Sequence, residues 1–548
     1  MADLAFDAVV VGGGNKGLVT ALYLAAFGGM SVGIFEGRHE LGGGWASDDA
    51  PAPGFIGDSH CANTNSRYFL PLLEDFPDFS EKSGGFVEMP VARSVILEED
   101  HSCITIYGKS VDPDGTKTAA QIARFSEKDA EIWMKLYHNY WKPGGLHDAS
   151  IRDENNLALS PNERSWVEKQ LDEFIAEPGC PIDHRWTRLS MIQACRELWE
   201  SVEMRVFLAW STGRSGAPAD VDGSAGPVLD LPEEASHLVA VGGTHSVAHA
   251  VIRMILERGG KFYSRKWVNK ILIENGRATG VRLEDGSEVK ARKVVVTDVS
   301  PYQLCFEMVG KEYFSPEIMR KIACLKNDSS CITWYTWAIH NPVNWKASKF
   351  NPDINKAGWI VLGWRDDEYT SREHHMCQLG ITPKERQVCI WGTPTLIDPS
   401  RAPAGKHLIC TEQMMPPANR WTERQWMEFK KTNAEQTMAI FERYATNMNW
   451  DNVIGYNPIT PYDIANRSPN FAPEGGFAVI NNTPTLVGKF RPIQEFARHR
   501  CGIAGLYPTG SAWPPKGGGH SCQGYNCYKA IAEDLHLDKP WEKKGRPW

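Results

Sequence analysis

Residues 6–47 decide the fold, and they read FDAVVVGGGNKGLVTALYLAAFGGMSVGIFEGRHELGGGWAS. The apolar run 6–11 has the length and the β-branched content of a buried parallel strand. The sequence GGGNKG at 12–17 then fits G-x-G-x-x-G and opens a helix, after which a second short strand, 31–35, leads to Glu36. This order of strand, glycine turn, helix, strand and acid predicts a Rossmann-type dinucleotide-binding unit in an α/β protein.

Each position of the glycine turn has a physical role. Gly12 permits the tight turn, Gly14 lets the backbone approach a pyrophosphate, and Gly17 lets the helix pack closely on the strand. Asn15 lies in the turn that opens the helical run 18–28, and the unpaired amides at the N-terminus of that helix favour an anion. Glu36 is positioned to accept a hydrogen bond from a ribose hydroxyl. A purely structural glycine turn is the alternative interpretation, and the surrounding strands and helix favour the nucleotide site.

A second glycine cluster, Gly42-Gly43-Gly44-Trp45-Ala46-Ser47, follows the acid closely. It resembles the extended FAD fingerprint of the two-dinucleotide-binding-domain flavoproteins. This resemblance implies FAD as the cofactor, with Gly43, Gly44, Trp45 and Ser47 among the residues that bind it. The family pattern carries an arginine after the glycine pair, and this chain has Gly44 there, so it departs from the pattern at one phosphate contact.

The composition narrows the class of protein. A chain of 548 residues can hold two or three domains, and its net charge of -8, from 59 basic and 67 acidic residues, argues against a nucleic-acid partner. The 13 cysteines include no C-x-x-C pair, so we expect no metal site, and reduced thiols of a cytoplasmic protein. The N-terminus has no basic signal region, and the longest apolar helical run is too short to span a bilayer.

Two later segments return to the nucleotide-binding pattern. Around 241–297 the sequence predicts a helix that stops at Gly259-Gly260, then two hairpins and a buried strand. Near the C-terminus a strand that ends at Gly510 leads into a glycine-rich loop, 517–519, and a further helix. Together with the fingerprint, these segments resemble the phytoene desaturase and carotenoid isomerase group of FAD-dependent oxidoreductases, which also includes anaerobic monoterpene dehydrogenases.

The resemblance implies further cofactor-binding residues. Val268 would meet the adenine through its backbone, and the C-terminal loop and helix would bring a positive helix end to the flavin pyrimidine edge. The residues assigned to that edge are Gly510, Ser511, Gly518, Gly519 and Gln523. Amine oxidase relatives normally carry an acid where Ser511 stands, which weighs against an amine oxidase.

The resemblance also divides the chain. It implies a discontinuous, Rossmann-type FAD-binding domain and an inserted mixed α+β substrate domain. The FAD-binding segments are 1–100, 237–330 and 491–548, the inserted helical region is 101–236, and the substrate domain is 331–490. The residues after Leu537, among them Lys543, Lys544 and Arg546, are expected to form a solvated end.

Candidate catalytic and substrate-binding residues follow from side-chain chemistry. His60 and His520 lie near the expected flavin, and imidazole exchanges protons near neutral pH, so both are candidates for a general acid or base. The alternative for each is a loop histidine with a structural role. Trp334, Trp337 and Trp513 are candidate walls of an apolar pocket, with core packing as the alternative, and the first two should lie on opposite faces of one strand.

The leading hypothesis is an FAD-dependent desaturase or dehydrogenase that takes a hydride from an apolar, unsaturated, terpenoid-like substrate to flavin N5. A redox-neutral isomerase or hydratase of the same fold is the first alternative, and a non-catalytic escort-type binding protein is the second. No second G-x-G-x-x-G follows a strand, so we expect a separate electron acceptor: a quinone, an electron-transfer protein or oxygen. Peripheral membrane contact and a homo- or hetero-oligomer are left open.

Overall fold

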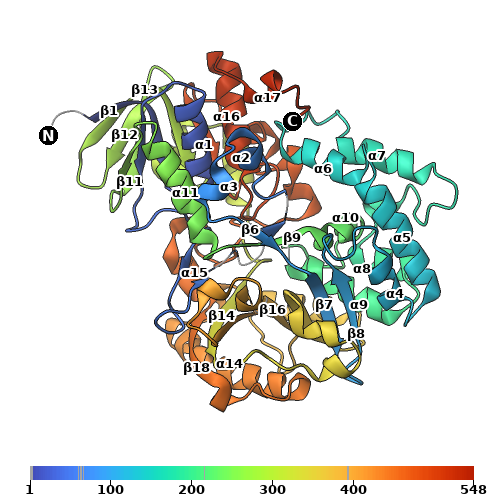
Figure 1. The fold of residues 1–548 in the computed structure, drawn as a ribbon. Coiled ribbons are helices and arrows are strands. Elements are labelled where there is room, and N and C mark those ends of the chain that lie inside the picture. Colours follow the sequence, from blue (N-terminus) through green and yellow to red (C-terminus); the bar gives the residue numbers. More distant parts are fainter. Residues whose placement is uncertain (1–3, 60, 62–63, 66, 215, 392–393) are drawn as a thin grey trace.

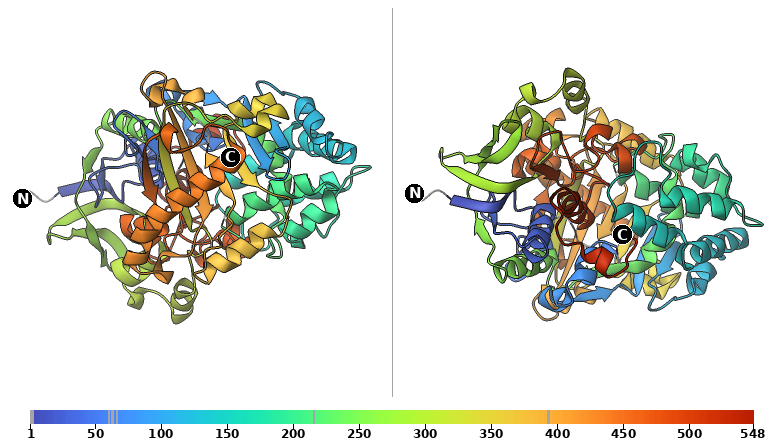
Figure 2. Two further views of the ribbon diagram at one scale, coloured as in Figure 1. Left: turned by 90° about the horizontal axis from the view of Figure 1, so that it is seen from below. Right: turned by 90° about the horizontal axis from the view of Figure 1, so that it is seen from above.

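Two seven-stranded sheets form the frame of the protein (Figure 1). The structure is a computed structural model that describes residues 4–59, 61, 64–65, 67–214, 216–391 and 394–548. Figure 2 shows the N-terminal strand at one end of the molecule and the helices of the inserted region at the other. The two sheets meet between these ends, so a site shared by them lies in the interior.

The first sheet has the order β10-β2-β1-β13-β12-β11, with β19 paired to the last residues of β13. The sheet is parallel from β10 through β2 and β1 to β13, and β19 also pairs with β13 in parallel. Strand β12 pairs antiparallel with β13, and β11 pairs antiparallel with β12. Residues 8–11 of β1 are all buried, as expected for a parallel strand that is covered on both faces. The strands are β1 (Leu4–Val11), β2 (Val32–Phe35), β10 (Lys261–Tyr263), β11 (Val268–Glu274), β12 (Arg277–Leu283), β13 (Glu288–Asp298) and β19 (Leu506–Thr509).

Three helices complete the Rossmann-type unit. Helix α1 (Asn15–Ala26) packs against α11 (Thr244–Leu256) and α16 (Cys522–Leu535), so segments far apart in the sequence share one hydrophobic core. A Cβ added to Gly524 would lie 2.5 Å from the Lys16 carbonyl oxygen, so glycine is what allows α1 and α16 to approach so closely. The N-terminal glycine turn and the C-terminal loop are thereby brought to the same edge of the sheet.

The second sheet has the order β18-β14-β17-β16-β15-β7-β8 and is antiparallel except where β15 pairs with β7. The long helix α14 (Glu423–Tyr444) packs on one face of it, through a cluster that includes Trp337 and Phe441. The strands are β7 (Val91–Leu97), β8 (Cys103–Tyr107), β14 (Ile332–Ile339), β15 (Trp359–Gly363), β16 (Val388–Trp391), β17 (His407–Met414) and β18 (Val453–Ile459).

Many of the remaining elements belong to the helical insertion at the right of Figure 1. The helices are α2 (Leu70–Asp75), α3 (Phe79–Lys82), α4 (Thr116–Ile122), α5 (Glu127–Trp141), α6 (Leu146–Glu154), α7 (Trp166–Ile175), α8 (Met191–Leu198), α9 (Val202–Arg214), α10 (Gly226–Leu229), α12 (Pro316–Ala323), α13 (Tyr369–Gln378), α15 (Pro461–Arg467) and α17 (Pro540–Lys543). The short strands are β3 (Ser47–Asp48), β4 (Gly57–Asp58), β5 (Thr64–Asn65), β6 (Phe86–Glu88) and β9 (His237–Ala240).

The predicted α/β fold, with a Rossmann-type sheet and an inserted mixed sheet, is confirmed. The domain boundaries stay a prediction. The expectation of a solvated end after Leu537 is wrong, because Trp541 is buried and Arg546 pairs with buried Asp75 at 2.7 Å. In the part of the chain that the structure describes, no helix has both the length and the apolar character needed to cross a bilayer.

Candidate functional site

A deep cavity runs from the carboxyl ends of the parallel strands to the second sheet. Near the first sheet it is lined by the last residues of β1, β2 and β13, which are Val11, Phe35 and Asp298. Ligands of doubly wound sheets bind at this edge, outside the carboxyl ends of the strands. The position is therefore that of a dinucleotide, and the cavity continues beyond it towards β14, β16 and β17.

The two glycine clusters meet backbone to backbone on one wall of this cavity. The amide of Gly42 donates to the carbonyl oxygen of Gly13 at 2.8 Å. A Cβ added to Gly43 would lie 2.9 Å from Gly14 Cα, and one added to Gly14 would overlap the Asp298 carboxylate. Side chains are thus excluded from this wall, and backbone groups face the cavity.

Helix α1 points its N-terminus at the same wall. Gly14 is its N-cap and makes no side-chain cap, while Gly14 and Asn15 both line the cavity. Gly12 has φ +91°, a conformation that glycine adopts without strain. The first amides of the helix and its dipole therefore favour an anionic group such as a pyrophosphate.

Glu36 and Val268 lie at one end of the cavity. The Glu36 carboxylate accepts from the Gly13 amide at 2.8 Å and from the Arg38 amide at 2.8 Å. These bonds fix the carboxylate while leaving lone pairs for a ribose hydroxyl. Val268, the first residue of β11, lines the cavity beside Trp267, and its contact with the adenine stays a prediction.

Asp298 and Lys16 are two ionisable, cavity-lining groups that sequence reasoning missed. Asp298 accepts from the Gly17 amide at 3.1 Å, and burial raises its pKa while Lys16 opposes the rise. Burial lowers the pKa of Lys16 to about 8, with Asp298 opposing that shift too. The signal for Asp298 was its position: an acid at the carboxyl end of a buried parallel strand faces the ligand edge.

The C-terminal glycine loop closes over the N-terminal turn. The Gly519 carbonyl oxygen accepts from Asn15 Nδ2 at 3.0 Å and from Trp45 Nε1 at 2.8 Å. The amide of Gly518 donates to Ser511 Oγ at 2.9 Å, and the Gly518 carbonyl oxygen accepts from Lys16. Asn15, Ser511, Gly518 and Gly519 all line the cavity, so residues separated by most of the chain are brought together there.

Other predicted cofactor residues stand behind this wall, outside the cavity lining. Gly17 and Trp45 contact lining residues, as described above, and a Cβ on Gly510 would lie 2.6 Å from Asp298 Oδ1. Ser47 Oγ donates to buried Asp58 at 2.6 Å, and Gln523 Nε2 donates to the Lys516 carbonyl oxygen at 2.6 Å. These contacts shape the wall, and a direct role for these residues in binding stays a prediction.

The second sheet closes the cavity with aromatic side chains and one carboxylate. Trp334 and Trp391 line it, with ring centroids 5.9 Å apart, and the Trp334 indole donates to the Asp58 carbonyl oxygen at 2.7 Å. Glu412 lines it too, is 1% exposed, and accepts from Trp391 Nε1 at 2.6 Å. Neither Trp391 nor Glu412 was selected from the sequence, because strand alternation does not reveal which face meets the cofactor.

The other two predicted substrate tryptophans lie in hydrophobic cores. Trp337 is on the opposite face of β14 from Trp334, as the strand period requires, and packs on Tyr456 at 5.0 Å between ring centroids. Trp513 donates to the Val299 carbonyl oxygen at 2.9 Å and stacks on Phe496. Neither side chain lines the cavity among the described residues.

Of the two candidate histidines, His60 lies outside the described residues. His520 is 6% exposed and stacks on Tyr68, a cavity-lining residue, at 3.8 Å between ring centroids. Burial first, and then nearby Lys516, hold the pKa of His520 well below its usual value. His520 thus backs a lining residue in its neutral form, and its catalytic role stays a prediction.

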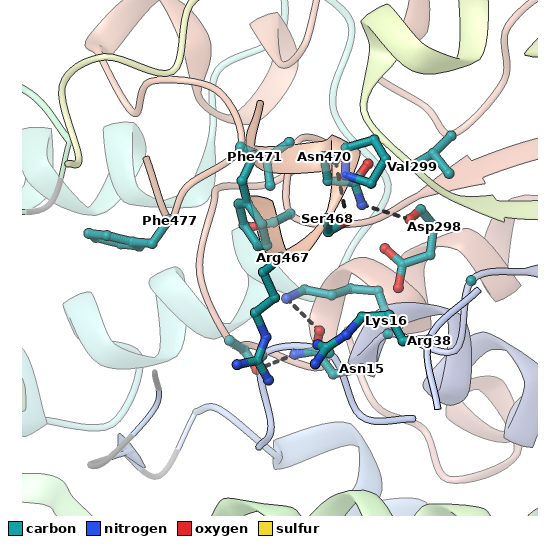
Figure 3. A pocket seen from close by; sticks show the side chains of 18 of the residues that line it. Asn15, Lys16, Arg38, Asp298, Val299, Arg467, Ser468, Asn470, Phe471 and Phe477 are labelled. Carbon is teal, nitrogen blue, oxygen red and sulfur yellow. Dashed lines mark hydrogen bonds between the residues drawn. The ribbon is translucent and has the colours of Figure 1, made fainter. Parts of the chain in front are cut away.

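Figure 3 shows two arginines, Arg38 and Arg467, beside Asn15 and Lys16 at the cavity. Arg38 follows Glu36 by two residues, and Arg467 ends α15 in the second inserted region. No sequence motif links these two arginines, because more than 400 residues separate them.

The cavity fits FAD on these observations. A glycine-rich wall, the first amides of α1 and a fixed carboxylate suit a dinucleotide, and the aromatic wall beyond leaves room for a flavin ring and a second, apolar molecule.

Comparisons with known proteins agree with this interpretation. Residues 10–78 match the model of the NAD(P)-binding Rossmann-like domain, and residues 228–428 match the flavin containing amine oxidoreductase family. Cyclohexylamine oxidase from Brevibacterium oxydans shares the fold, with a TM-score of 0.56 at 14% identity over 97% of this chain and 100% of that one.

Curated relatives extend over nearly the whole chain. The pyridine nucleotide-disulfide oxidoreductase domain-containing protein 2 of Rattus norvegicus is 25% identical over 97% of this chain and 94% of its own length. A limonene dehydrogenase subunit of Castellaniella defragrans is 22% identical over 98% and 96%. The neurosporene-forming phytoene desaturase of Rhodobacter capsulatus is 27% identical over 53% and 51%.

The fold, the cavity and these relatives define a flavin-dependent oxidoreductase whose cofactor is FAD. These comparisons match the phytoene desaturase-like group of FAD-dependent oxidoreductases, the group that the sequence motifs resemble. As an oxidoreductase it needs both a substrate and an electron acceptor.

Proposed function

We propose that this enzyme dehydrogenates an apolar, unsaturated, terpenoid-like molecule. The observation that carries the proposal is the continuity of the cavity from the glycine wall to Trp334 and Trp391. Aromatic side chains bind flat, unsaturated molecules through large apolar contacts, and few polar groups face this end of the cavity. The likeness to a limonene dehydrogenase and to a phytoene desaturase supports the same substrate class.

Dehydrogenation removes a hydride from one carbon and a proton from a neighbouring carbon. FAD, when bound, supplies the hydride acceptor. We propose that the Glu412 carboxylate accepts the proton, since it lines the cavity and is held in place by Trp391 Nε1 at 2.6 Å. Trp334 and Trp391 orient the substrate over the cofactor site. Glu412 is itself buried, so its carboxylate is shielded from water.

The two electrons must then leave for a separate acceptor. A quinone, an electron-transfer protein or oxygen would serve, and the likeness to one subunit of a dehydrogenase supports an assembly with another chain. NADH and NADPH should reduce the flavin slowly because the sequence contains no second strand-linked G-x-G-x-x-G. The cytoplasmic location expected from the cysteine pattern stays a prediction.

The test is anaerobic mixing of the purified, FAD-loaded protein with limonene, phytoene and prolycopene, one at a time. A substrate should bleach the visible flavin absorbance and yield a product that has lost two hydrogen atoms. A rearranged product of unchanged mass, formed without an electron acceptor, would instead identify a redox-neutral isomerase. If none of the three compounds bleaches the flavin and none is converted, the proposed substrate class is contradicted.

A further inference from the structure

Arg38 and Arg467 present two positive charges to the cavity without a paired carboxylate. Among the residues that the structure describes, neither guanidinium takes part in an ion pair or a side-chain hydrogen bond, and both line the cavity (Figure 3). Burial lowers the pKa of Arg467, and the charge of Arg38 lowers it further, while Asp48 and Glu40 oppose the shift without reversing it. Arginine nevertheless remains protonated in proteins, so the pair carries excess positive charge that an anion would neutralise.

The family fingerprint carries an arginine of its own at the position that Gly44 holds in this chain. Gly44 lines the same cavity, and a Cβ added there would meet no atom within 4 Å. The space beside Gly44 therefore opens into the cavity without an arginine of the fingerprint. The sequence after the glycine pair supplies none, whereas Arg467 enters from the second inserted region.

The segment that carries Arg467 is fixed to the Rossmann-type sheet. Asn470 Nδ2 donates to the Asp298 carbonyl oxygen at 3.1 Å, and its Oδ1 accepts from the Ser300 amide at 2.6 Å. Ser468 and Phe471 line the cavity on either side of this anchor. Arg467 is thus presented by a segment whose position is set by the end of β13.

We infer that Arg38 and Arg467 bind the pyrophosphate of FAD, with Arg467 taking the place of the arginine that Gly44 replaces. A diphosphate matches the pair in charge, and a planar guanidinium can bind two phosphate oxygens at once. Asn15, at the N-terminus of α1, lies beside the two arginines (Figure 3), so the diphosphate would be held by backbone amides and side-chain cations together. Cofactor binding then depends on a residue of the predicted substrate domain.

A second source offers the same chemistry. An apolar substrate that carries its own diphosphate, such as a prenyl diphosphate, would also seek these arginines. The experiment therefore has one arm for the cofactor and one for such a substrate.

The first arm titrates the full-length, flavin-stripped chain with FAD and with riboflavin, which has no phosphate, and follows flavin fluorescence. Arg467→Gln should weaken FAD binding about tenfold to a hundredfold, leave riboflavin binding unchanged, and flatten the salt dependence of FAD binding. Arg467→Lys should recover part of the loss because it keeps the charge. Arg424→Gln, an exposed arginine of α14, is the matched control and should bind both flavins normally.

A compensating variant separates this role from damage to the fold. Gly44→Arg combined with Arg467→Gln should restore FAD affinity, since open space beside Gly44 admits the side chain. The stripped Arg467→Gln chain should melt no lower than the wild type, because the removed charge has no paired carboxylate among the described residues. Equal weakening of FAD and riboflavin, or no weakening of either, would overturn the inference.

The second arm adds geranyl diphosphate to the FAD-loaded protein. Under the inference, it should bind no differently to the wild type and to Arg467→Gln, because FAD already occupies the pair. Binding that disappears in Arg467→Gln, with FAD affinity unchanged, would assign the arginines to a substrate anion and refute the cofactor role. Both binding experiments remain interpretable if the proposed terpenoid activity is absent, because neither of them measures turnover.

Discussion

One wall of the cavity is made of backbone from two glycine clusters, whereas the facing wall is made of side chains from separate segments of the chain. The glycine wall leaves no room for a Cβ at Gly14 or Gly43, and its sequence is confined to residues 12–44. The facing wall uses Trp334, Trp391, Glu412 and Arg467, which come from three strands and a helix. Substitutions on the glycine wall should therefore prevent cofactor binding by steric overlap. Substitutions on the facing wall should impair catalysis by removing single functional groups.

The largest effect is expected where the glycine wall is filled. Gly14→Val would push the Asp298 carboxylate away and occupy the space that a pyrophosphate needs, so the protein should purify without flavin. The ratio of visible flavin absorbance to protein absorbance measures this. Gly44→Ala is the control, because its Cβ meets open space and full FAD content is expected. Retained flavin in Gly14→Val would show that the cofactor does not approach this turn.

The facing wall should show the opposite pattern. Glu412→Gln keeps the shape of the side chain but removes the proton acceptor, so substrate-dependent flavin reduction should slow by about a hundredfold to ten-thousandfold. FAD content should be unchanged, because Glu412 lies across the cavity from the glycine clusters. Stopped-flow absorbance measures the rate, and Glu442→Gln, an exposed carboxylate on α14, is the control. A normal rate in Glu412→Gln would remove it from the mechanism.

A smaller effect is expected at the edge of the glycine wall. Glu36→Ala deletes a charge-assisted hydrogen bond to the ribose, worth about 1.5–3 kcal/mol, so FAD should bind about tenfold to a hundredfold more weakly. Fluorescence titration of the flavin-stripped chain measures the dissociation constant. Glu40→Ala is the comparison, since Glu40 also lines the cavity but makes no side-chain hydrogen bond among the described residues. Equal affinity in the two variants would exclude a ribose contact.

The same contrast explains what the sequence could predict. A backbone wall imposes glycine at close approaches, so Gly12, Gly14 and Gly43 leave a local signature that can be recognised without a structure. An acid at the end of a buried strand is a weaker signal. The facing wall had no local sequence signal, because Glu412 and Arg467 acquire their positions only when distant segments fold together. Strand period correctly separated the two tryptophans of β14 but could not tell which of them faces the cavity.

The smallest effect is expected at His520, which the sequence marked as a candidate acid or base. Burial keeps its imidazole neutral, and it backs Tyr68 from outside the cavity lining, so His520→Gln should change turnover by less than about tenfold and leave the shape of the pH profile intact. A lost limb of that profile would instead restore His520 as a proton-transfer group.

Stability gives an independent measure of the same histidine. Because the pKa of His520 is depressed in the folded state, its contribution is fully present above the unfolded value of about 6.5 and is lost as pH falls below it, when the unfolded chain takes up the proton. Urea unfolding at neutral pH and at about one unit below the unfolded pKa should therefore show a smaller acid-induced loss in His520→Gln than in the wild type. An equal loss in both proteins would mean that His520 binds its proton in the folded state as readily as in the unfolded chain. That result would contradict a neutral, structural imidazole behind Tyr68.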